Sequence, residues 1–187
     1  MNPEVLDNEF LKPLKTDMQN PVFAGFWIRA WASIIDSLVF IPVIIISFQN
    51  VLSWKLLGLE ILTTFAWMFY KVFMEWKYQA TLGKMAMKIK VVNESGDSMT
   101  LEQSLVRFSL YFLSYMGTLM VNYYLFMDAD FAEVQTLSEL VILQESRADS
   151  VGAFANFPMM ISVMFVVFDS KKQALHDKMA KTYCVYR

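Results

Sequence analysis

Four long apolar stretches constrain the fold of this chain more than any other feature of its sequence. A helix that crosses the hydrocarbon core of a bilayer needs about 20 mostly apolar residues, and only a helix or a closed barrel pairs its own backbone groups there. The predicted spans cover residues 26–48, 54–76, 105–126 and 151–168. The last is the shortest and contains Pro158, which favours a kink. The sequence therefore predicts an all-α membrane protein with four transmembrane helices.

The composition excludes an ordinary water-soluble domain. Apolar residues make up 56% of the 187 residues and charged residues only 18%, whereas a soluble domain has about 25% charged residues. The mean hydropathy is +0.39. With one cysteine and one histidine, the chain has neither an internal disulfide nor a multi-histidine or cysteine-cluster metal site. We expect a polar tail over residues 1–22 rather than a signal peptide, and a membrane domain over residues 23–187.

The lysine and arginine residues predict the orientation, because they resist translocation across the membrane. If the N-terminus is cytoplasmic, all of the 16 basic residues except Lys55 and Arg147 lie on the cytoplasmic side or near the cytoplasmic end of a span. Residues 77–104 then form the cytoplasmic loop. The outer loop, residues 127–150, is rich in aspartate and glutamate. We therefore expect both termini, including the polar tail, in the cytoplasm.

Two short segments outside the spans have the character of β-strands. KIKVV at 88–92 alternates between basic and apolar residues, and TYCVY at 182–186 is rich in aromatic and β-branched residues. We expect the two to pair as a small cytoplasmic sheet. Thr100 and Gln103 have the spacing of a capping box, which predicts the start of the helix that enters the third span.

The outer loop has a pattern of its own. Phe131, Val134, Leu137 and either Leu140 or Val141 recur at helical spacing. The pattern predicts an amphipathic helix that lies on the outer membrane face or against a partner protein.

Three charged residues inside the predicted spans need a physical reason, because each costs roughly 2.5–3.5 kcal/mol on insertion scales. Arg29 enters the first span near its cytoplasmic end, where it either snorkels to the interface or takes part in a site. Asp36 lies about 10 Å deeper on the same face, so its short side chain must be protonated, be paired or face a wet cavity. Glu60 enters the second span from outside and either snorkels, hydrogen-bonds a neighbouring helix, or forms a cation or proton site with Asp36.

Near the cytoplasmic ends of the spans one ion pair is expected and a second is geometrically possible. Lys71 and Glu75 are four residues apart on one helix and predict a local pair. Asp169 ends the fourth span at about the depth of Arg29. A bridge between Arg29 and Asp169 would therefore join the first and fourth helices.

Three blocks of sequence resemble a known family. They read AGFWIRAWASIIDSLVF at 24–40, QATLGKMAMKIKVV at 79–92 and ALHDKMAKTYCV at 174–185. In this order, and framing most of the chain, they resemble the RDD family of bacterial integral membrane proteins, named for an arginine and two aspartates. The resemblance implies a multi-pass protein of the bacterial cytoplasmic (inner) membrane.

The family's named residues map onto this chain in part. Arg29 and Asp36 match the arginine and the first aspartate, whereas Asp169 and Asp177 are both candidates for the second. The TLGK motif lacks the glycines of a phosphate-binding loop, so we expect Gly83 to turn the chain and Lys84 to lie at the lipid headgroups.

The LHDK motif near the C-terminus has a structural interpretation too. No sequence motif identifies a serine or cysteine nucleophile near it, so we expect the His176–Asp177 pair to fix the cytoplasmic sheet. No nucleophile–base pair and no HExxH motif is visible in the chain, and we therefore predict no catalytic residue and no enzymatic activity.

Two functions from different classes are compatible with the sequence. Members of the RDD family have been linked to cation/proton antiport, which implies a secondary transporter that exchanges a cation or small ligand for protons through Asp36, with Glu60 and Arg29 assisting. The alternative is a non-transporting accessory or regulatory subunit that binds another membrane protein through its outer loop. Both functions predict the lipid bilayer and either a homo-oligomer or a larger membrane protein as partners, without nucleic acid, cofactor or metal.

Overall fold

The computed structural model describes residues 20–146 and 157–187. Its elements are α2 (Phe26–Val39), α3 (Ile41–Gln49), η1 (Asn50–Trp54), α4 (Leu57–Tyr78), α5 (Leu82–Ala86), β1 (Ile89–Asn93), α6 (Leu101–Met127), η2 (Asp130–Glu133), α7 (Leu137–Ser146), α9 (Phe157–Phe168), α10 (Leu175–Met179) and β2 (Thr182–Tyr186). Most of the predicted tail, residues 1–19, lies outside the described residues. The fold is mainly helical with one small sheet, as the sequence predicts.

The long helices account for only part of the four-span prediction. Both α4 and α6 are long and apolar enough to cross a membrane. The first predicted span is instead a pair of helices, α2 and α3 with η1, that meet at a bend of 60°. Pro42 explains the break, because in the first turn of α3 its missing N–H is harmless, whereas in a continuous helix its ring would collide with the preceding turn.

The structure describes only part of the fourth predicted span. Its described part is α9, whose 12 residues extend about 18 Å against a hydrocarbon core of roughly 30 Å. Pro158 lies in the first turn of α9 and does not kink its interior. Residues 151–156 of the predicted span lie outside the described residues. The described residues thus hold two helices that are long and apolar enough to be spans, or up to three candidate spans if the bent pair is one.

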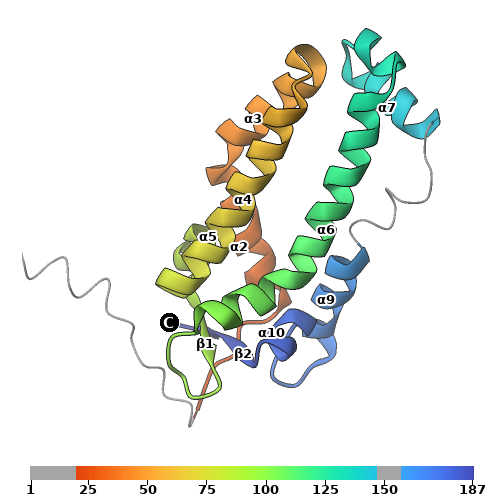
Figure 1. Ribbon diagram of the computed structural model, residues 1–187. Coiled ribbons are helices and arrows are strands. Elements are labelled where there is room, and N and C mark those ends of the chain that lie inside the picture. Colours follow the sequence, from red (N-terminus) through yellow and green to blue (C-terminus); the bar gives the residue numbers. More distant parts are fainter. Residues whose placement is uncertain (1–19, 147–156) are drawn as a thin grey trace, which may run out of the picture.

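Figure 1 shows how the elements are arranged. Both strands and α10 gather at one end of the long helices, and α7 lies at the other. We call the end with α5, α10, β1 and β2 the sheet end, and the end with η1, η2 and α7 the loop end. Between them α6 packs against α4 and α9, while α2 packs against α5.

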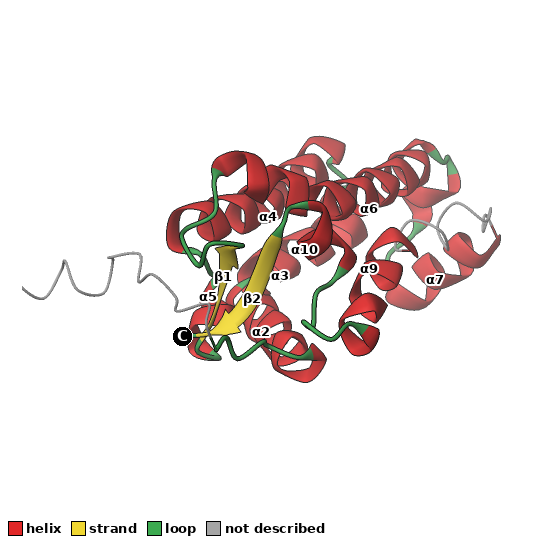
Figure 2. Ribbon diagram, turned by 90° about the horizontal axis from the view of Figure 1, so that it is seen from below, coloured by secondary structure: helices red, strands yellow, loops and turns green. Residues whose placement is uncertain are grey.

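The small sheet forms as predicted. β1 and β2 pair antiparallel, with Ile89 opposite Tyr186 and Asn93 opposite Thr182, and Figure 2 shows the two strands from the sheet end. Val91, Val92 and Val185 are fully buried. The sheet therefore carries a small core of its own that fixes the C-terminal segment to the helices.

The helix start at Thr100 is also confirmed. The Thr100 hydroxyl accepts a hydrogen bond from the Gln103 backbone N–H at 3.1 Å, and the Gln103 side chain accepts one from the Thr100 N–H at 3.0 Å. This capping box sets the start of α6 and thereby the position of every side chain on it.

The loop end departs from the predicted single amphipathic helix. The segment is two helices, η2 and α7, separated by residues 134–136, of which Val134 is extended. Phe131, Val134, Leu140 and Leu143 pack with Leu125 of α6 in one apolar cluster. Leu137, which shares the predicted spacing, and Val141, the alternative to Leu140 in it, are 53% and 42% exposed, because the break changes the face that α7 presents.

Candidate functional site

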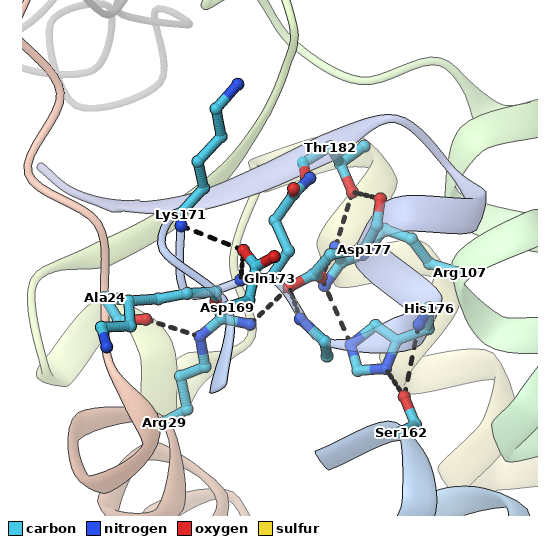
Figure 3. A network of polar contacts seen from close by, with 12 residues as sticks. Ala24, Arg29, Arg107, Ser162, Asp169, Lys171, Gln173, His176, Asp177 and Thr182 are labelled. Atoms are coloured by element: carbon cyan, nitrogen blue, oxygen red, sulfur yellow. Dashed lines mark hydrogen bonds and ion pairs between the residues drawn. The ribbon is translucent and has the colours of Figure 1, made fainter. Parts of the chain in front are cut away.

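Asp177 of α10 is the centre of a buried charge network at the sheet end (Figure 3). Its Oδ2 accepts hydrogen bonds from Nη1 of Arg29 and from the Ala174 N–H, the latter at 3.0 Å. Its Oδ1 accepts from Nη1 of Arg107. Asp177 is 0% exposed, so one carboxylate joins the guanidinium groups of α2 and α6 away from water.

Each arginine has further partners that fix its position. Arg29 donates to the carbonyl oxygens of Ala24 at 2.9 Å and Lys172 at 2.7 Å. Arg107 donates to the Thr182 hydroxyl at 2.7 Å and to Oε2 of Glu75 at 3.1 Å. The network thus connects α2, α4, α6, α10 and the first residue of β2.

Glu75 extends this network along α4. Its Oε1 accepts a hydrogen bond from Nζ of Lys84 on α5. Glu75 thus forms its close ion pairs with Lys84 and Arg107 from other elements. Lys71, its predicted local partner, interacts with it electrostatically and places Nζ 3.6 Å from the ring centroid of Tyr111. Lys84, expected at the lipid headgroups, therefore binds a carboxylate inside the fold.

The predicted Arg29–Asp169 bridge is wrong. Asp169 pairs with Lys178 at 2.6 Å and accepts the backbone N–H groups of Lys171 and Gln173 at 3.0 Å. It closes the turn between α9 and α10, so Asp177 is the partner of Arg29. Burial alone would raise the pKa of Asp177, but the guanidinium groups of Arg107 and Arg29 hold it well below its usual value, and the carboxylate is ionised.

His176 lies beside this carboxylate in an arrangement that has the order of a catalytic triad. Its Nδ1 is 2.7 Å from the Ser162 hydroxyl and its Nε2 is 3.3 Å from Oδ1 of Asp177. Since an ionised carboxylate only accepts, the proton of a neutral ring lies on Nε2, and Ser162 donates to Nδ1. Burial lowers the pKa of His176 to about 3, which keeps the ring neutral. Ser162 is 0% exposed, so the geometry joins α9 to α10 rather than presenting a nucleophile.

Asp36 is held by three donors. Its Oδ1 accepts from the Tyr70 hydroxyl at 2.8 Å and the Gly83 N–H at 2.7 Å, and its Oδ2 accepts from the Thr81 hydroxyl at 2.6 Å. A Cβ on Gly83 would lie 1.9 Å from the Ala32 carbonyl oxygen. Gly83 therefore permits a close approach of α5 to α2, and Asp36 fastens the TLGK segment to the first helix.

Glu60 lies in a different part of the bundle. Its Oε2 accepts from the Ser47 hydroxyl at 2.7 Å and its Oε1 from the Asn122 amide at 3.1 Å, so the carboxyl joins α3, α4 and α6. Glu60 is 7% exposed. Asp36 binds Tyr70, ten residues further along α4, which is about 15 Å away at the helical rise. The structure does not bring the two carboxyl groups together.

Several residues of the network carried no clear signal in the sequence. Arg107 appeared only as one of the basic residues near a cytoplasmic end, and Ser162 and Thr182 are ordinary residues of an apolar helix and a strand. The four-residue spacing of Lys71 and Glu75 pointed to a local pair. A buried glutamate with two cationic partners from other helices requires knowledge of how α4, α5 and α6 pack.

Comparison with known proteins identifies the family. The model of the RDD family matches residues 23–181, which include Arg29, Asp36 and Asp177. No curated protein and no solved structure matches the chain. The matched region extends from the bridge at Phe23 to the residue before β2, and so contains every residue of the charge network except Thr182. The chain is a membrane protein and belongs to the RDD family.

Proposed function

We propose that this protein is a small secondary transporter that exchanges a cation or small ligand for protons, and that Glu60 is the exchanging group. The observation that carries the proposal is the set of partners around Glu60. Its carboxyl group is buried between α3, α4 and α6, and its hydrogen-bond partners, Ser47 and Asn122, are neutral. A carboxyl group with neutral partners in an apolar environment binds either a proton or a cation.

The partners of Glu60 suit both states. The Ser47 hydroxyl donates to a carboxylate and also accepts from a carboxylic acid, and the Asn122 amide offers both a donor and an oxygen ligand. Proton release and cation binding at this carboxyl group therefore need only small rotations of its neighbours. One bundle of this size gives little room for alternating access, and we propose that two copies work together.

Asp36, the main candidate for the exchanging group in the sequence analysis, has a structural role in this proposal. Its two oxygens already accept hydrogen bonds from Tyr70, Thr81 and Gly83. An exchange reaction at Asp36 would release the TLGK segment from α2 in every cycle. The carboxyl group of Glu60 makes no such connection to a loop.

The proposed orientation has the sheet end in the cytoplasm of a bacterial inner membrane. The distribution of lysine and arginine supports it, since only Lys55 and Arg147 fall on the other side. A cysteine introduced at Ile142, which is 65% exposed, should react with a membrane-impermeant thiol reagent in intact cells. Protection of that cysteine in intact cells and labelling only after lysis would reverse the orientation.

The transport proposal is tested in reconstituted vesicles that enclose a pH-sensitive dye. We expect wild-type protein to move protons when an alkali cation gradient is imposed, and Glu60→Gln to stop this movement while remaining folded. Asp36→Asn should still transport, because an asparagine keeps an acceptor for Tyr70 and Gly83 and a donor for Thr81. Wild-type vesicles without cation-dependent proton movement, across a panel of alkali cations, would overturn the proposal.

The second candidate is the accessory subunit, and α7 favours it. One face of α7 packs into the loop-end cluster through Leu140 and Leu143, and the other exposes Leu137, Val141 and Ile142. Such a face fits a partner protein at the membrane surface. If it docks, Ile142→Asn should lose a partner that purifies with the wild-type protein at a fixed ratio, and Glu139→Gln, on the same helix, should retain it. We propose no enzymatic activity, because the buried Ser162 is out of reach of a substrate.

A further inference from the structure

A row of polar side chains runs along the contact between the two long helices. Residues spaced three, four or seven apart share one face of a helix. Polar residues recur at this spacing on α4 and on α6, which pack together, and the buried Met68 interrupts them on α4 between Thr64 and Lys71. We call this row the α4–α6 seam. Its members are Glu60, Thr64, Lys71 and Glu75 of α4, and Arg107, Tyr111, Ser114, Thr118 and Asn122 of α6.

Direct contacts cross the seam at both of its ends. At the loop end the Asn122 amide donates to Glu60 at 3.1 Å. Towards the sheet end Lys71 Nζ lies 3.6 Å from the ring centroid of Tyr111, and Arg107 donates to Glu75 at 3.1 Å. Polar contacts therefore join α4 and α6 towards both ends of this helix pair, and Met68 of α4 is buried between them.

Ser114 lies between these contacts, and its hydroxyl has no hydrogen-bond partner in the part of the chain that the structure describes. The residue is only 5% exposed. It is three residues from Tyr111 and eight from Asn122, which is about 4.5 Å and about 12 Å along the helix axis. The neighbouring Thr118 hydroxyl donates to the Ser114 carbonyl oxygen at 3.1 Å and leaves the Ser114 hydroxyl unpaired.

A buried hydroxyl without a protein partner is a typical position for an internal water molecule, because an unpaired polar group in an apolar medium is unstable. We propose that the α4–α6 seam admits water and that Ser114 binds it, so that protons reach Glu60 along the seam. The carboxylic acid of Glu60 gives its proton to a water molecule in the seam and is left as the carboxylate, and the proton passes through further water molecules to the bulk water outside the bundle. The proton route rests on the proposed transport function, whereas water access to Ser114 does not.

Water access is tested with single introduced cysteines. A thiolate forms only where water reaches the sulfur, so a small charged methanethiosulfonate reagent should modify Ser114→Cys. Leu113→Cys is the matched control, since Leu113 is the next residue on α6 and is 56% exposed on its outer side, where lipid surrounds it. The native Cys184, which is 1% exposed, sets the background. If the reagent modifies neither Leu113→Cys nor Ser114→Cys, the proposal is overturned.

The proton route is tested by flux in the same vesicles as the transport proposal. Ser114→Ala should slow cation-driven proton movement roughly ten-fold, the effect of about one hydrogen bond, without lowering the melting temperature. Ser109→Ala is the control, because the Ser109 hydroxyl is on the exposed side of α6 and binds its own helix at Val106. Wild-type flux in Ser114→Ala together with a loss in Glu60→Gln would overturn the route and leave the transport function standing. Absence of flux in the wild type would overturn both, and the cysteine modification would still decide whether water enters.

Discussion

The two ends of the bundle hold their carboxyl groups in opposite ways. At the sheet end, Asp177 and Glu75 each bind two cationic side chains from different elements. At the loop end, Glu60 binds a serine hydroxyl and an asparagine amide. Ion pairs fix the charge of a carboxylate, whereas neutral partners allow it to change.

This difference distinguishes the carboxylates that stabilise the fold from the carboxyl group that we propose for transport. Loss of one member of a buried ion network leaves the others unpaired, which is strongly destabilising. Hydrogen bonds between helices within a membrane contribute only about 0.6 kcal/mol on average. Substitutions at the sheet end should therefore change stability, and substitutions at the loop end should change transport with little change in stability.

The largest effect is expected for Asp177→Asn. The neutral amide leaves Arg29 and Arg107 without a counter-charge, and the free energy of unfolding in detergent should fall by about 3–5 kcal/mol. Asp169→Asn is the control, since Asp169 pairs with the half-exposed Lys178 and should cost about 1 kcal/mol or less. Equal melting temperatures for the two variants would show that the buried network contributes no more to stability than an ordinary surface ion pair.

Gly83→Ala should come next in size. Its Cβ would lie 1.9 Å from a backbone oxygen of Ala32 and 2.9 Å from Cγ of Asp36, so α5 must move away from α2. Overpacking of this kind costs about 1–3 kcal/mol. Gly58→Ala, where the added Cβ meets nothing within 4 Å, should be neutral or stabilising. A stable Gly83→Ala protein would show that the Asp36 contact does not hold α5 in place.

The neutral His176 predicts a pH dependence of stability. Its pKa falls from 6.5 in the unfolded chain to about 3 in the folded protein, chiefly through burial. The unfolded state therefore binds the extra proton first, and stability should fall by roughly 1 kcal/mol for each pH unit as the pH drops below 6.5 towards 3. Above 6.5 the contribution is fully present.

Melting temperatures measured from pH 7 down to pH 4 check this prediction. His176→Asn removes the titrating group and should flatten the curve over this range. The low pKa of Asp177 acts in the same direction, but only where the unfolded carboxyl begins to protonate, near pH 4 and below. A wild-type curve that is already flat would contradict a buried neutral ring.

The smallest change in stability is expected for Ser47→Ala. The substitution removes one of the two neutral hydrogen-bond donors to Glu60 and leaves Asn122 in place. The free energy of unfolding should therefore fall by only about 0.6 kcal/mol. The cation dependence of transport should nevertheless shift, because one of the oxygen atoms beside the carboxyl group is gone. A large loss of stability would show that Glu60, like Asp177, mainly stabilises the fold.

Local patterns predicted the parts of the fold that depend on neighbouring residues. The alternation in KIKVV and the strand-like composition of TYCVY predicted β1 and β2, and the spacing of Thr100 and Gln103 predicted the cap of α6. Pro42 was a signal for the break in the first span that the apolar pattern concealed, because isoleucine and valine continue on both sides of it.

The site depends on contacts between residues that are far apart in the sequence, and the periodicity of apolar residues does not reveal such contacts. Arg29 and Asp177 are 148 residues apart, and Asp36 and Gly83 are 47 apart. Depth along a helix suggested Asp169 as the partner of Arg29, but the turn after α9 carries α10 back against α2 and α6. The sequence also placed Asp36 near Glu60, because a straight first helix would bring their depths together, whereas α2 ends at Val39 and α3 starts on a new axis.

The most direct test of the central claim is the protonation state of Glu60 itself. Infrared difference spectra of the reconstituted protein, with and without the transported alkali cation, report the carbonyl stretch of a protonated carboxylic acid. We predict that this band disappears on cation addition in the wild type and in Asp36→Asn, and that it is absent throughout from Glu60→Gln. A cation-sensitive band that persists in Glu60→Gln, or a wild-type spectrum that does not respond to any alkali cation, would contradict the account.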